Sequence, residues 1–137
     1  WISWADKKNR KLKKNKNILK NVLILINIFK YKLLIKIMGI NFCIDSLKKG
    51  FFNLRIDPRQ LSALLNSKFI NFFKPSCLVK SLTFKKLTRN SKEFILIIGV
   101  AKLDGVFESH AWVEKDNRII LNSDPNISAF KKIFSYE

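Results

Sequence analysis

The sequence is poor in the residues that build metal sites, disulfide scaffolds and linkers. Its 137 residues include only two cysteines and one histidine, too few for a zinc site of four Cys or His ligands. Four glycines and three prolines exclude a collagen-like or linker-like chain. We therefore expect neither a metal nor another cofactor, and we interpret Cys43 and Cys77 as free thiols in a reducing compartment.

Acidic residues are scarce too, because ten Asp and Glu face 27 Lys and Arg, for a net charge of +17. Seven of these cations lie in residues 7–16, so we predict a basic, mobile arm over residues 1–16. No aromatic side chain lies among those charges, and we therefore expect no specific nucleic-acid binding. The arm is interpreted either as a solvated tail or as a segment attracted to nucleic acid or an anionic membrane.

The apolar run over residues 22–29 is too short to cross a membrane. A spanning helix needs about 20 mainly apolar residues, whereas Lys20 and Lys36 enclose only 15 residues, interrupted by Lys30 and Lys32. No small-residue cleavage site follows the run, as a signal peptide would require. We expect no membrane span and a cytoplasmic location.

Residues 17–137 suffice for a single domain, and the order of its predicted elements indicates an α+β fold. Its first part, residues 17–90, shows the apolar periodicity of helices. Small and polar residues that commonly end or cap helices mark the boundaries. The expected helices span residues 17–38, ended by Gly39, residues 57–74, capped by Asp57, and residues 77–88, capped by Ser76.

After residue 90 the apolar period changes to that of a β-meander, expected over residues 93–124. Turn sequences at Asp104-Gly105 and Asp116-Asn117 divide the meander. We predict a three-stranded antiparallel sheet packed against the helix that begins at Cys77. The expected strands span residues 94–100, 106–114 and 118–122, and the tail, residues 125–137, is expected to form a short helix from Ser128 to Phe134.

Cys77 and His110 are the residues best suited to catalysis. The free N–H groups of a helix N-terminus carry partial positive charge, which favours a thiolate at Cys77, and Lys80 adds to that charge. A nucleophilic cysteine needs an imidazole within hydrogen-bond reach, and His110 lies on a predicted strand that can pack near the start of the helix.

A third group should orient the imidazole of His110. The register of the last hairpin decides which residue lies opposite His110. Depending on the length of the turn, this residue is Asp124, Asn122 or Ser123. We favour Asp124, because a carboxylate stabilises an imidazolium better than an amide does, and keep Asn122 as the rival.

Three blocks of this sequence stand out, Pro75–Leu82, Ile97–Val100 and Phe107–Glu114, the last of which contains His-Ala-Trp-Val-Glu. A cysteine at a helix start, a strand, a histidine strand and then a polar residue follow the chain order of transglutaminase-like and papain-like cysteine folds. The three blocks resemble the leader-peptidase domain of lasso-peptide biosynthesis, a bacterial member of the transglutaminase-like superfamily. The resemblance covers about residues 70–125.

The resemblance implies a cysteine peptidase that removes the leader from a ribosomally made precursor peptide through a thioester. Cys77 would be the nucleophile and His110 the general base and acid, with Asp124 or Asn122 as the third member. The family often has Asp near the position of Asn122, and it prefers Arg at the position of Lys80. The implied partners are the precursor peptide, a companion protein that binds the leader as an added β-strand, and a lasso cyclase.

Two other functions are compatible with the same pattern. One is amide transfer or another hydrolysis on a transglutaminase-like scaffold. The other is a non-catalytic, basic interaction protein that retains the fold.

Overall fold

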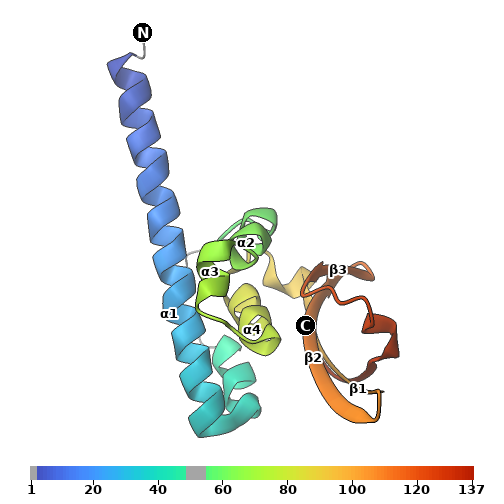
Figure 1. The fold of residues 1–137 in the computed structure, drawn as a ribbon. Coiled ribbons are helices and arrows are strands. Elements are labelled where there is room, and N and C mark those ends of the chain that lie inside the picture. Colours follow the sequence, from blue (N-terminus) through green and yellow to red (C-terminus); the bar gives the residue numbers. More distant parts are fainter. Residues whose placement is uncertain (1–2, 49–54) are drawn as a thin grey trace.

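The computed structural model describes residues 3–48 and 55–137. It combines helices with one antiparallel sheet, in agreement with the predicted α+β class. Figure 1 shows a long first helix on one side, a layer of three short helices beside it, and the sheet beyond that layer. The helices are α1 (Trp4–Lys48), α2 (Pro58–Leu65), α3 (Lys68–Phe72) and α4 (Cys77–Leu87), and the strands are β1 (Ile95–Leu103), β2 (Val106–Lys115), β3 (Arg118–Leu121) and β4 (Lys131–Tyr136).

Helix α1 is longer than the sequence predicted at both ends. Residues 4–16, where an arm was expected, are exposed and helical, in keeping with the high helix propensity of their lysines, arginine and leucine. Gly39 interrupts the helix as expected, with a φ of 79° that favours glycine, but a further helical segment continues to Lys48 (Figure 1). Residues 1–2 of the expected arm lie outside the described residues, and the boundary at residue 16 stays a prediction.

The helix expected over residues 57–74 is two helices, because Ser67 starts a new one. The Asp57 carboxylate accepts from two N–H groups at the start of α2, and the Ser67 hydroxyl accepts from Ile70 N at the start of α3. Ser76 caps α4 in the same way, through Val79 N at 3.2 Å. Each cap satisfies N–H groups that a helix end leaves without a partner, and the caps predicted at Asp57 and Ser76 are confirmed.

The sheet has four strands in the order β3-β2-β1-β4, not three. The predicted final helix over residues 128–134 is wrong, because only Ile127–Ala129 forms a short 3₁₀ turn and β4 follows it. Strand β4 pairs antiparallel with β1, with Ile98 opposite Phe134. The tail therefore covers the edge of β1 that a three-stranded meander would leave open.

Apolar residues fill both faces of the sheet. On the face toward α4, Leu96 and Val113 join Leu82 of that helix in the main core. On the opposite face, Ile97, Trp112 and other buried residues form a smaller core. Strand β1 is therefore buried on both faces, and the smaller core also packs against the strand that carries His110.

No helix within residues 3–48 and 55–137 has the length and apolar content needed to span a membrane.

Gly99 leaves room for the Trp112 ring in the smaller core. A Cβ at Gly99 would lie 2.8 Å from the Trp112 ring and 3.1 Å from the Phe130 Cβ. We expect Gly99→Ala to lower the free energy of unfolding by about 1–3 kcal/mol, because the packed ring cannot move freely. Urea unfolding measures this loss, and an unchanged midpoint would contradict it; Ser109→Ala, exposed on β2, is the control.

Candidate active site

Cys77 is the first residue of α4 and is half-buried. The Ser76 side chain caps the N–H of Val79, which leaves the Cys77 N–H at the open end of the helix. Lys80 lies one turn further along. Burial lowers the pKa of the Lys80 ammonium, and negative charge on Cys77 acts in the opposite direction. The thiol therefore sits at the positive end of a helix, in the field of a nearby ammonium.

His110 lies on β2 and packs against the aromatic side chains of the smaller core. Its ring stacks on Trp112 at a centroid distance of 5.9 Å and contacts Phe130 at 5.6 Å. Its Nε2 lies 2.7 Å from the main-chain oxygen of Asn122. A carbonyl oxygen can only accept, so Nε2 carries the hydrogen and Nδ1 of the neutral ring keeps its lone pair. The imidazole is therefore oriented with Nδ1 as the basic atom.

Trp112, on which the imidazole rests, is itself fixed by polar contacts. Its indole N–H donates to Glu114 at 2.8 Å, and Lys132 of β4 donates to the same carboxylate at 3.1 Å. The ring is almost fully buried. The His110 ring thus packs against Trp112, and β4 helps to fix the position of Trp112.

Asn122 connects α4 with the histidine strand. It follows the end of β3 and adopts a left-handed conformation with φ of 61°, which asparagine tolerates better than most residues. Its side-chain amide donates to the Cys77 main-chain oxygen at 2.8 Å, to Ser81 Oγ at 2.9 Å and to the Ala111 main-chain oxygen at 3.1 Å. The main-chain oxygen of Asn122 binds His110. Asn122 therefore contacts both candidate catalytic residues, Cys77 and His110.

Asp124 is not brought to the imidazole. Its carboxylate accepts from Asn126 N at 2.7 Å and stabilises the turn before β4. The hairpin has a two-residue turn, since Lys115 pairs with Arg118, and a bulge then shifts the register. Strand β3 ends at Leu121, so no residue is paired opposite His110 through β3. The loop after β3, and not strand pairing, therefore decides where the candidate residues lie. It places Asn122 beside the imidazole and Asp124 in the turn before β4.

Cys77 and His110 are joined through Asn122 in the described part of the chain, where no hydrogen bond links the thiol to the ring. The sequence analysis missed the main-chain carbonyl that binds the imidazole, and it missed Ser81. A helical serine four residues after the cysteine, on the same face, is a signal that could have found the second contact.

Cys43 differs from Cys77 in burial. It is fully buried in the main core, and burial raises the pKa of its thiol. Cys43 therefore behaves as a small apolar core residue. Both cysteines are free, which leaves Cys77 as the half-buried thiol of the pair.

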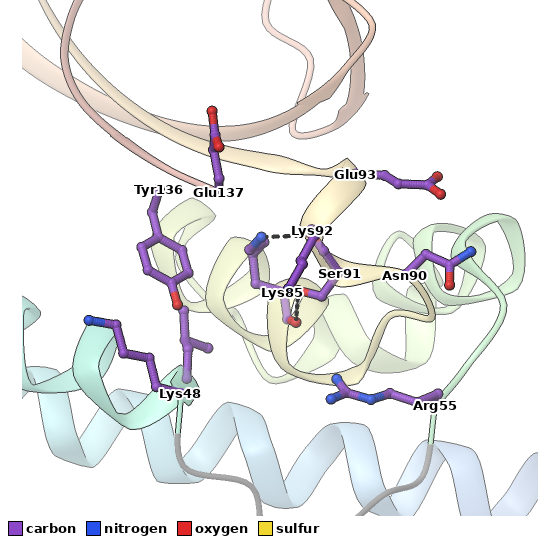
Figure 2. A pocket seen from close by; sticks show the side chains of 10 residues that line it. Lys48, Arg55, Lys85, Asn90, Ser91, Lys92, Glu93, Tyr136 and Glu137 are labelled. Atoms are coloured by element: carbon purple, nitrogen blue, oxygen red, sulfur yellow. Dashed lines mark hydrogen bonds between the residues drawn. The ribbon is translucent and has the colours of Figure 1, made fainter.

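A separate cavity of about 600 Å³ lies where α1, the end of α4 and β4 meet. Figure 2 shows Lys85, Tyr136 and Glu137 around it, and neither Cys77 nor His110 lines it. The Lys85 ammonium donates to the main-chain oxygens of Ser91 and Phe94 at 2.8 and 2.7 Å. Burial lowers the pKa of this ammonium to about 8, opposed by the charge of Glu137.

Within residues 3–48 and 55–137, no group of three or more His, Cys, Asp and Glu side chains is arranged to hold a metal ion.

Comparison with known proteins identifies one family. A model of the transglutaminase-like superfamily matches residues 57–135, which is more than half of the chain. No curated protein and no solved structure matches the chain significantly. The matched range begins at the cap of α2 and contains α4, the sheet up to the last residue but one of β4, and the site around Asn122.

Asn122→Asp tests the connection between α4 and β2. The variant keeps the shape of the side chain but replaces the amide donor by a carboxylate, which repels the main-chain oxygens of Cys77 and Ala111 and can only accept from the Ser81 hydroxyl. We expect the free energy of unfolding to fall by about 1–3 kcal/mol, the cost of leaving buried acceptors unpaired. Urea denaturation at neutral pH measures the change.

Asn117→Asp is the matched control for this variant. Asn117 is also left-handed, with φ of 60°, but it is exposed at the hairpin turn. We expect a change within about 0.5 kcal/mol there. Equal effects at the two positions would show that the Asn122 amide does not hold the elements together.

Lys85 predicts how stability changes with pH. Its pKa is about 8 in the folded chain and about 10.4 when unfolded, so between these values the unfolded chain binds more protons. The free energy of unfolding should therefore rise as the pH increases from 8 to 9.5, by on the order of 2 kcal/mol. Lys85→Met should remove this rise, and Lys92→Met, an exposed neighbour at the same cavity, should keep it. Parallel pH profiles for the wild type and Lys85→Met would contradict the assignment.

Proposed function

The chain belongs to the transglutaminase-like superfamily, and from this we propose that it is a cysteine peptidase with Cys77 as nucleophile. Its substrate is a ribosomally made precursor peptide, and the bond that it cuts joins the leader to the core during lasso-peptide maturation. The free state of both cysteines supports a reducing, cytoplasmic compartment.

The contacts of Asn122 carry this proposal. Its amide holds the main-chain oxygen of Cys77, and its main-chain oxygen lies 2.7 Å from His110 Nε2. One residue thus holds the cysteine end of α4 and orients the ring of His110. The arrangement supports His110 as the group that works on the Cys77 thiol, with Nδ1 as the basic atom.

The third position is assigned to Asn122 rather than Asp124. The Asn122 carbonyl orients the ring and accepts a hydrogen bond from it in both its neutral and its charged form. A neutral carbonyl stabilises an imidazolium less than a carboxylate would. Asp124 is engaged with Asn126. We therefore propose a Cys-His-Asn site in which Asn122 acts as a positioning residue.

The proposed reaction is acyl transfer to Cys77 and then to water. His110 takes the thiol proton, and the thiolate sulfur bonds to the scissile carbonyl carbon. The Cys77 N–H, at the open end of α4, donates to the oxyanion that forms. The C–N bond then breaks, His110 gives its proton to the leaving amine, and a thioester remains. Water attacks the thioester while His110 accepts its proton, which releases the carboxylate and returns the thiol.

Two partners are part of the proposal, a leader-binding companion protein and a lasso cyclase. Both follow from the resemblance of the blocks around Cys77 and His110. The companion would bind the leader as an added strand and deliver the scissile bond to Cys77. The cyclase would use the amine that this cleavage exposes.

The direct test incubates the chain with the precursor peptide encoded beside it and the companion protein. We expect mass spectrometry to detect one cut between leader and core. Cys77→Ala should abolish the cut, a loss of at least about 10³-fold, because no nucleophile remains. Cys43→Ala, which removes the other thiol, should retain it. His110→Ala should abolish the cut without changing the circular dichroism spectrum.

Other outcomes would identify the rival functions. Transfer of the acyl group to an added amine, in preference to water, would favour a transferase on the same scaffold. A Cys77 that iodoacetamide alkylates no faster than the buried Cys43, with salt-sensitive polyanion binding, would indicate a non-catalytic interaction protein. Cleavage by Cys77→Ala at the wild-type rate would exclude the proposed nucleophile.

A further inference from the structure

Helix α1 carries an exposed apolar stripe on the side opposite to the one that it buries in the main core. Its members recur at intervals of four, four, three, four and four residues, and each is 46–66 % exposed. The opposite side of the same helix is fully buried in the main core, through Ile24, Ile28 and Tyr31. The apolar stripe consists of Ile18, Val22, Ile26, Phe29, Leu33 and Ile37.

Phenylalanines of α3 widen this surface. Phe69 and Phe72 are 51 % and 79 % exposed, and Phe29 of the stripe meets Phe73 edge-on at 5.8 Å. A shallow cavity of about 280 Å³ lies between α1 and Phe69. Contiguous exposed apolar surface of this kind is typical of a site that binds another protein or a membrane.

The same helix is strongly basic. Residues 4–36 contain eleven Lys and Arg and a single acidic residue, Asp6. Seven of the cations are exposed in residues 7–16, immediately before the stripe, and Trp4 at the beginning of the helix is 77 % exposed. The occupant of the stripe must therefore be apolar where it meets Ile26 and Leu33 and negatively charged around it.

A second copy packed in parallel does not meet these requirements. Two copies packed along the stripe in that direction would place their seven-cation segments side by side, which like charges oppose. Intervals of four, four and three follow an 11-residue period of 3.67, not the repeat of 3.5 residues that a left-handed coiled coil needs. That period keeps the stripe on one nearly straight line, as a flat surface requires.

We propose that α1 binds along the surface of an anionic phospholipid bilayer. The apolar stripe and the α3 phenylalanines enter the boundary between headgroups and acyl chains, and the lysines of residues 7–16 bind the phosphates. Figure 1 shows α2–α4 between α1 and the sheet, so docking along α1 and α3 leaves the strand of His110 away from the membrane. The bilayer would then hold the chain in place without occupying the candidate active site.

Vesicle sedimentation tests this proposal with the whole chain. Vesicles of phosphatidylcholine mixed with phosphatidylglycerol should pellet the protein, and vesicles of phosphatidylcholine alone should pellet much less. The triple variant Ile26→Ser, Leu33→Ser, Ile37→Ser should bind the anionic vesicles at least about tenfold more weakly, because it loses the buried apolar area. The three positions are 58 %, 58 % and 66 % exposed, so the fold should be kept.

Matched controls distinguish membrane binding through the apolar stripe and its neighbouring lysines from binding through other exposed apolar residues or other cations. Val106→Ser, Phe107→Ser and Ile133→Ser together remove equally exposed apolar residues far from α1 and should bind as the wild type does. Lys11→Gln, Lys13→Gln and Lys14→Gln should weaken binding more than Lys102→Gln, Arg118→Gln and Lys131→Gln, although both sets remove three exposed cations.

Three results would overturn the proposal. The first is no pelleting with anionic vesicles, which would leave the stripe to an acidic protein partner. The second is equal binding by the wild type and the stripe variant, which would indicate adsorption by charge alone. The third is a dimer in sedimentation velocity that the stripe variant converts to a monomer, which would assign the stripe to a second copy. None of these results depends on peptidase activity.

Discussion

The amide of Asn122 is the contact on which the arrangement of the two halves depends. It donates to the first residue of α4, to the hydroxyl of Ser81 and to the main chain of β2. Helix α4 and the sheet also meet through apolar side chains such as Leu82, Leu96 and Val113, which set their separation but not their exact register. A side-chain amide with three fixed acceptors sets that register, because each hydrogen bond tolerates only a narrow range of distance and direction. The relative position of Cys77 and His110 follows from it.

The smaller core supports the imidazole of His110 on the face of the sheet opposite to α4. Gly99 leaves space for Trp112, Trp112 supports the imidazole, and β4 supplies the ammonium that holds Glu114 beside the indole. The fourth strand is therefore more than an edge cover. Strand β4 lies at the end of the matched superfamily range. Through Glu114 and Trp112 it helps to orient the ring that is proposed to transfer the proton, because a histidine on an uncovered face of the sheet would have no fixed orientation.

Helix α1 has two apolar sides with different roles. One side belongs to the core together with α4, and the other is exposed along the helix. Core packing therefore accounts for only part of the wide apolar face of residues 17–38. A helix that is apolar around most of its circumference buries one side in its own fold and leaves the other for a partner, here in a strongly basic setting.

Local patterns in the sequence determined the α+β class, the caps at Asp57 and Ser76, the break at Gly39, both hairpin turns and the start of α4 at Cys77. These features depend on neighbours within a few residues, so that local chemistry is enough to predict them. Only the tertiary structure decided that residues 131–136 form a strand, because the open edge of β1 is distant in sequence. It likewise placed the main-chain oxygen of Asn122 beside the imidazole and the Asp124 carboxylate in the turn before β4, because β3 ends at Leu121 and the left-handed Asn122 redirects the chain. Long-range pairing and loop direction carry no local signature, and the candidate site is built from both.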